Sequence, residues 1–159
     1  MDLSKAFKTD KRAESEGKKL VLVAARPTKG GLPAVQEEFL LIARKTNTNY
    51  KTYLQSLLQE NRALLDTGTP EAEALAQLLM KQAASKHLLI GWGGPLEVDG
   101  PADAAGEPTK VPLGAYDHDK SLALMEMDDF YKLVDDYASS MSNYRAEEVA
   151  KDAKNSAST

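Results

Sequence analysis

The chain has 159 residues and a formal net charge of −4, from 20 lysines and arginines against 24 aspartates and glutamates. This composition is typical of one globular domain, and a chain of this length can bury about 70% of its extended surface. The absence of cysteine excludes disulfides, thiolate nucleophiles and cysteine-containing zinc modules, and the negative charge argues against binding to nucleic acid phosphates.

The first segment, residues 1–17, is polar and rich in lysine, and it predicts a flexible arm. It lacks the long apolar core of a secretion signal. The apolar runs elsewhere are far shorter than the roughly 20 residues that a membrane-spanning helix needs. We therefore expect a cytoplasmic protein that does not contact membranes.

The next region, residues 18–45, predicts a β-hairpin. The runs LVLV at residues 20–23 and FLLI at residues 39–42 are short, apolar and of the kind that forms buried strands. Two prolines and a Gly-Gly pair lie between them and require a loop. A helix beginning near Val35 is the competing interpretation of the second run.

Residues 47–90 predict a pair of antiparallel helices. The apolar residues of the stretch YKTYLQSLL follow a helical period. Thr69 and Pro70 are typical of a helix start, because they supply a capping oxygen and a first-turn proline. The second helix is expected to continue to Ile90, where the sequence GWGG at residues 91–94 stops it.

Residues 93–115 are rich in glycine and proline, and they predict a second, short hairpin on the surface with its turn at Asp99-Gly100. Residues 117–144 then predict two helices, which Asp117 and Asp128 would cap. The second of these helices has an apolar stripe that consists of Phe130, Leu133, Val134, Tyr137, Ala138 and Met141.

The last segment, residues 145–159, consists mainly of alanine and charged or small polar residues, and it predicts a flexible tail. The chain as a whole is therefore expected to form one α+β domain over residues 18–144. In that domain the N-terminal β-hairpin packs on a mostly helical body, and the second hairpin lies on the surface.

Catalytic chemistry is not indicated by any motif. No metal-ligand spacing connects His87 and His118. The aspartates at 128, 129, 135 and 136 are explained by a helix start and a solvated helix face. The GWGG sequence lacks the lysine and the following helix of a phosphate-binding loop. We expect no metal, no cofactor and no enzymatic activity.

The second half of the chain has a distinctive order of features. GWG at 91–93 is followed by a glycine-rich hairpin, VP at 111–112, YD at 116–117, a helix that opens with DDF at 128–130, and KNS at 154–156. This order resembles the tail assembly chaperones of long-tailed, lambda-like bacteriophages and prophages. The chain departs from that pattern in its longer hairpin and in the histidine and aspartate that follow YD.

The resemblance implies a protein without enzymatic activity that acts in the host cytoplasm during virion assembly. Such a chaperone binds the tape-measure protein, helps to recruit the tail-tube protein, and is absent from the mature virion. A further partner to consider is a second copy of the same chain, in a homo-oligomer. The alternatives are a structural virion component, such as a tail or head–tail accessory protein, and more remotely a small nucleotide-binding or hydrolytic enzyme.

A helical face that carries methionines suits adaptable binding to an amphipathic partner helix. Most of the apolar stripe is also needed for the protein's own core. The residues expected to contact a partner are Trp92, Met125, Met127, Phe130 and Met141.

Overall fold

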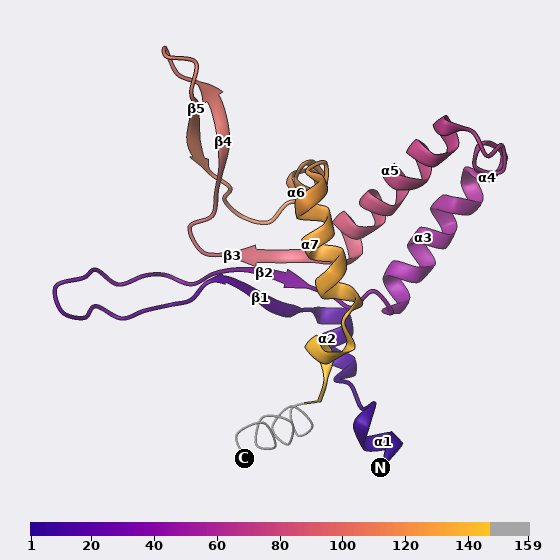
Figure 1. Cartoon of the computed structure of the whole chain (residues 1–159), viewed down its shortest axis with the longest axis horizontal. Helices are drawn as coiled ribbons and strands as arrows, with labels where there is room; N and C mark the ends of the chain where they lie inside the picture. Colours follow the sequence, from indigo (N-terminus) through magenta and orange to yellow (C-terminus); the bar gives the residue numbers. More distant parts are fainter. Residues whose placement is uncertain (147–159) are drawn as a thin grey trace.

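The computed structural model describes residues 1–146 and has an α+β fold (Figure 1). The helices are α1 (Leu3–Ala6), α2 (Lys11–Glu16), α3 (Thr48–Glu60), α4 (Arg62–Leu65), α5 (Pro70–His87), α6 (His118–Met125), α7 (Asp128–Ser139) and the short 3-10 helix η1 (Met141–Tyr144). The strands are β1 (Lys18–Val23), β2 (Glu38–Ile42), β3 (Leu89–Gly93), β4 (Glu97–Ala102) and β5 (Pro108–Pro112).

The predicted N-terminal hairpin is confirmed, but it belongs to a three-stranded antiparallel sheet in which β2 lies between β1 and β3. The prediction of a helix through Ile90 was therefore wrong. Helix α5 ends at His87, and the next residues form β3. Residues 89–93 pair with the open edge of β2 instead, with Leu89 opposite Ile42. Gly93 leaves room for the Phe39 ring of β2, because a Cβ at this position would lie 2.5 Å from it.

The hairpin continues beyond its strands as a ribbon (residues 26–35) that projects from the body (Figure 1). Backbone pairs between Arg26 and Val35 and between Lys29 and Leu32 hold its two sides together. Its turn is Gly30-Gly31, where φ values of 56° and 78° favour glycine. Residues 26–34 are all exposed.

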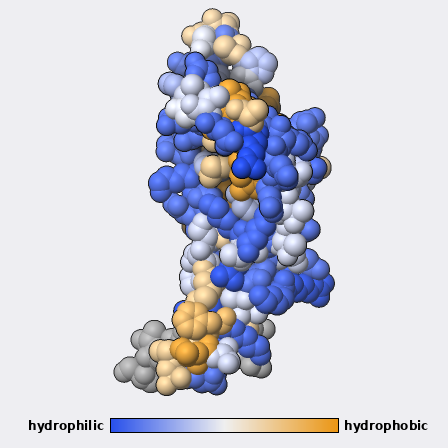
Figure 2. All heavy atoms as spheres, turned by 90° about the vertical axis from the view of Figure 1, so that its right-hand side faces the viewer, coloured by the Kyte–Doolittle hydropathy of each residue, from blue (hydrophilic) through white to orange (hydrophobic). Residues whose placement is uncertain are grey.

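The predicted pair of helices is present as a projecting arm that consists of α3, α4 and α5 (Figure 1). The side chain of Asn47 caps α3 and that of Thr69 caps α5, with Pro70 in the first turn. Figure 2 shows the end of this arm as a hydrophilic surface with an apolar strip in its middle. The arm carries three exposed leucines, Leu58, Leu64 and Leu78.

The second hairpin is also present, although its turn lies further along the chain than predicted. Strands β4 and β5 pair with Val98 opposite Val111. Asp99 and Gly100 lie within β4, and the chain reverses at residues 103–106 instead. There the carboxylate of Asp103 accepts hydrogen bonds from the backbone N–H groups of Ala105 and Glu107. These bonds stabilise a turn at Asp103 rather than at the predicted Asp99-Gly100.

Helices α6 and α7 follow the prediction in part. Asp117 caps α6 as expected, but Met127, and not Asp128, is the cap residue of α7. Of the predicted stripe, Val134 and Ala138 are buried, whereas Leu133 is exposed and Met141 lies beyond α7 in η1. The core combines residues from the sheet and from α3, α5, α6 and α7, and its members include Leu40, Ile42, Tyr50, Leu88, Leu89, Met125 and Val134.

The prediction of a flexible arm at residues 1–17 was wrong for its second half, because α2 packs on the body. Burial opposes ionisation of Glu14, but hydrogen bonds from Thr9, Arg44 and Lys11 outweigh it and lower the pKa of this carboxyl. Helix α1, by contrast, has no buried residue. Its neighbourhood exposes Met1, Leu3 and Phe7, and Figure 2 shows an apolar patch at the lower end of the molecule.

The C-terminal end of the described chain closes the fold. Tyr144 is completely buried, and its hydroxyl donates a 2.9 Å hydrogen bond to the carbonyl oxygen of Ile42. Arg145 pairs with Thr9 as an isolated β-bridge, so it is not part of a free tail. The remainder of the predicted tail, residues 147–159, lies outside the described residues.

Replacing Tyr144 with phenylalanine is expected to lower the free energy of unfolding by about 1–2 kcal/mol, because the buried Ile42 carbonyl loses its donor. Tyr131→Phe is a matched control, since the Tyr131 hydroxyl makes no hydrogen bond within residues 1–146. It should change the free energy by less than about 0.5 kcal/mol. Urea unfolding of both variants measures the difference, and equal losses would contradict the role given to this hydrogen bond.

Candidate interaction surface

The five predicted partner-binding residues lie in different environments. Met125 is completely buried in the core, so the expectation that it contacts a partner was wrong for this structure. Phe130 is half-buried against the core, and Met141 is half-buried in η1. Met127 alone among the five is largely exposed, at 52%. Met125 and Met127 differ because Met125, the last residue of α6, packs into the core, whereas Met127 lies in the turn that precedes α7.

Trp92 serves the fold on the outside of β3. Its indole Nε1 donates a 2.8 Å hydrogen bond to the carbonyl oxygen of Gly114, and its ring packs edge-on to Tyr116 at 4.7 Å. The Tyr116 hydroxyl in turn donates to the carbonyl oxygen of Leu89, at 2.7 Å. Trp92 therefore holds the segment that leads into α6 against β3.

Met127 borders a groove between the second hairpin and α6, which we call the hairpin groove. Its volume is about 530 Å³, within the usual range for binding sites. Its lining residues are Glu97, Val98, Asp99, Lys110, Leu113, Lys120, Ala123, Leu124 and Met127. Apolar side chains from a strand, a loop and a helix meet here. The periodicity of apolar residues within one element could not have predicted this groove, because its lining comes from three elements.

Polar groups hold the walls of the hairpin groove in place. The Lys120 ammonium donates hydrogen bonds to the carbonyl oxygens of Leu113, at 2.9 Å, and Ala115, at 3.3 Å. Lys110 forms an ion pair with Asp99 across the hairpin. The groove thus has an apolar floor and a charged rim, an arrangement that fits one face of an amphipathic helix.

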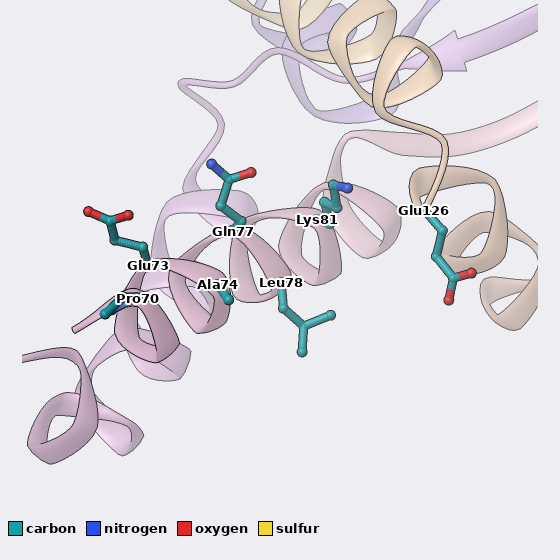
Figure 3. A pocket seen from close by; sticks show the side chains of 7 residues that line it. All are labelled: Pro70, Glu73, Ala74, Gln77, Leu78, Lys81 and Glu126. Atoms are coloured by element: carbon teal, nitrogen blue, oxygen red, sulfur yellow. The ribbon is translucent and has the colours of Figure 1, made fainter.

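A second groove, which we call the helix groove, runs along the outer face of α5 (Figure 3). Its volume is about 540 Å³. Two rows of α5 side chains, each spaced four residues apart, form most of this groove. Glu126, from the corner between α6 and α7, lies at one end of it. The rows consist of Pro70, Ala74 and Leu78, and of Glu73, Gln77 and Lys81. Glu126 and Met127 are neighbours in sequence, so the two grooves meet at this corner.

His118 lies near the buried Ser85, but the arrangement does not form an activated nucleophile. Nε2 of His118 is 3.3 Å from the Ser85 hydroxyl. That hydroxyl donates at 2.7 Å to the carbonyl oxygen of Gln82 and is completely buried. A nucleophilic oxygen must be able to face a substrate, and the Ser85 hydroxyl is completely buried.

The predicted explanation of the aspartates needs a correction. Asp135 was expected to face water, but its carboxylate lies 2.8 Å from the Lys45 ammonium and is three-quarters buried. Asp128 lies 2.7 Å from the Lys81 ammonium, whose hydrogen bond lowers the pKa of this carboxyl. Both aspartates therefore join α7 to other parts of the fold, a role that depends on elements distant in sequence.

Within residues 1–146, no three acidic or histidine side chains come together as a metal ion would require. In the same part of the chain, none of the helices is long and apolar enough to cross a membrane. Comparison of the chain with protein-family models, with curated proteins and with solved structures found no match.

The lowered pKa of His87 predicts that the free energy of unfolding depends on pH. Burial, and then the charges of Lys86 and His118, lower its pKa below the ordinary value of 6.5. The unfolded chain therefore binds this proton more readily than the folded chain does. The free energy of unfolding should be highest above pH 6.5 and should decrease as the pH falls through the lowered pKa.

Replacing His87 with glutamine is expected to flatten this decrease. Urea unfolding of wild type and variant at several pH values between about 7.5 and 5.5, a range that avoids most carboxyl titration, measures the two slopes. Equal slopes in the two proteins would show that His87 is not the group responsible.

Proposed function

We propose that this protein is a tail assembly chaperone of a long-tailed bacteriophage or prophage. In this role it binds the tape-measure protein in the host cytoplasm and helps to recruit the tail-tube protein, without enzymatic activity and without remaining in the virion. The order of motifs from residue 91 to residue 156 first suggested this function. The observation that carries the proposal in the structure is the hairpin groove, with exposed Met127 at its edge.

The hairpin groove suits a helical partner for three reasons. Its floor is apolar, with Leu113 and Leu124 held in fixed positions by the core. Met127 has a flexible and polarizable side chain that can adapt to different apolar residues of a long, repetitive helix. The charged rim can interact with polar residues on the flanks of that helix. A chaperone that shields successive segments of a long helical protein needs this kind of tolerance.

A structural virion component is the alternative. Such a component would use the same surfaces to bind its partners, but it would remain in the finished particle. Detection of the protein at constant stoichiometry in purified particles would favour this alternative, and its absence from them would favour the chaperone.

Co-expression with the tape-measure protein of the same genome tests the proposal. The tagged full chain should recover the tape-measure protein, and Met127→Glu should reduce the recovery about tenfold, because it places a charge at an apolar contact worth at least 1.4 kcal/mol. Leu64→Glu is the matched control, since Leu64 is 45% exposed on α4 and lines neither groove.

Loss of binding in Met127→Glu alone supports the hairpin groove as the binding site. Equal recovery by Met127→Glu and wild type would exclude this groove. No recovery by the wild-type chain would contradict the chaperone function itself. Far-ultraviolet circular dichroism of both variants checks that the fold is kept.

A further inference from the structure

The ribbon (residues 26–35) is a preformed element whose tip is exposed in the part of the chain that the structure describes. Residues 26–34 are exposed, and Leu32 near its tip is 55% exposed. Within residues 1–146, neither Arg26 nor Lys29 takes part in an ion pair. An isolated two-stranded hairpin is marginally stable in water, so contacts with another molecule would contribute to holding this one in its extended position.

The helix groove is apolar and acidic, whereas the ribbon is basic. Leu78, also 55% exposed, provides an apolar surface together with Pro70 and Ala74. Glu73 and Glu126 border this surface, and neither forms an ion pair within residues 1–146. Lys81, the cation of the groove, is already neutralised by Asp128 at 2.7 Å. The groove therefore presents an apolar centre between two unpaired carboxylates.

We propose that the tip of the ribbon binds in the helix groove of a second copy of this chain. Leu32 would cover the exposed surface of Leu78, and Arg26 and Lys29 would approach Glu73 and Glu126 of the other copy. Both contacts favour association. The first removes exposed apolar area from water, and the second brings opposite charges together.

A second copy is the occupant that the charges favour. The ribbon carries two cations and no anion, a charge of +2, and subtracting this from the net charge of −4 leaves −6 for the rest of the chain. Each copy thus offers a basic projection and an acidic body. The body includes the groove with its two unpaired carboxylates.

The contact must form between molecules, because the ribbon and α5 project on opposite sides of the body (Figure 1). An interface between two different surfaces of the same protein is heterologous, and it links copies head to tail into a ring or an open array. The proposal does not depend on the chaperone function, since it concerns a different groove and the purified chain alone.

Sedimentation velocity of the full chain over a range of concentrations tests the proposal. The weight-average mass should rise with concentration at low salt. It should fall towards the monomer mass at 1 M salt, where the screening length is about 3 Å. The double variants Arg26→Glu/Lys29→Glu and Glu73→Lys/Glu126→Lys should each weaken self-association at least tenfold. Lys51→Glu is the matched control, on an exposed position of α3 outside both surfaces.

Mixing the two double variants gives the sharpest result. The reversed ribbon of one variant then fits the reversed groove of the other, so the mixture should associate although each variant alone does not. A wild-type chain that stays monomeric at all concentrations would overturn the proposal. So would undiminished association of either double variant, or a mixture that stays monomeric. Circular dichroism excludes misfolding as the cause of any loss.

Discussion

The fold depends on the hydrogen bonds made by the backbone where β2 ends and the chain turns into α3. Over four residues, the Ile42 carbonyl accepts from Tyr144, and the N–H groups of Ala43, Arg44 and Lys45 donate to the carbonyl oxygens of Leu88, Glu14 and Ala138. The next cap, Asn47, also donates to a carbonyl oxygen of α5. Because buried backbone groups must be paired, this short segment fixes α2, the α5–β3 junction, α7 and the C-terminal end of the described chain against one another.

The grooves are a consequence of that arrangement. The α5–β3 junction, held by the end of β2, offers carbonyl oxygens to the segment that follows the second hairpin. The Tyr116 hydroxyl donates to Leu89 and the Ser121 hydroxyl to Ser85, at 2.7 and 2.8 Å. These bonds set α6 across α5, and the α6–α7 corner therefore separates the hairpin groove from the helix groove. The two proposed contacts are adjacent but distinct, so a partner helix in one groove and a neighbouring copy in the other would lie side by side at Glu126 and Met127.

Much of the local structure could be predicted from the sequence. The caps of α5 and α6 and the positions of β1 and β2 depend on residues close together in the chain. The predictions failed where a distant contact outweighed a local preference. Residues 89–93 became a strand because β2 offered an open edge, and α2 became part of the body because Arg44 pairs with Glu14. Of the candidate site, the sequence indicated Met127 but not the strand and loop residues that complete the groove.

The sequence by itself determined the composition of the surfaces. The cysteine-free acidic composition, the Gly-Gly turn with lysine and arginine beside it, and the positions of the methionines and leucines along the chain are properties of the sequence, and they hold in any fold. Only the tertiary structure decided which of these residues reach the surface. Met125 and Met127 are two positions apart, yet one is completely buried and the other 52% exposed. The physical reason is that burial depends on which elements pack together, and α5, α6 and the second hairpin meet through contacts between residues that are far apart in the chain.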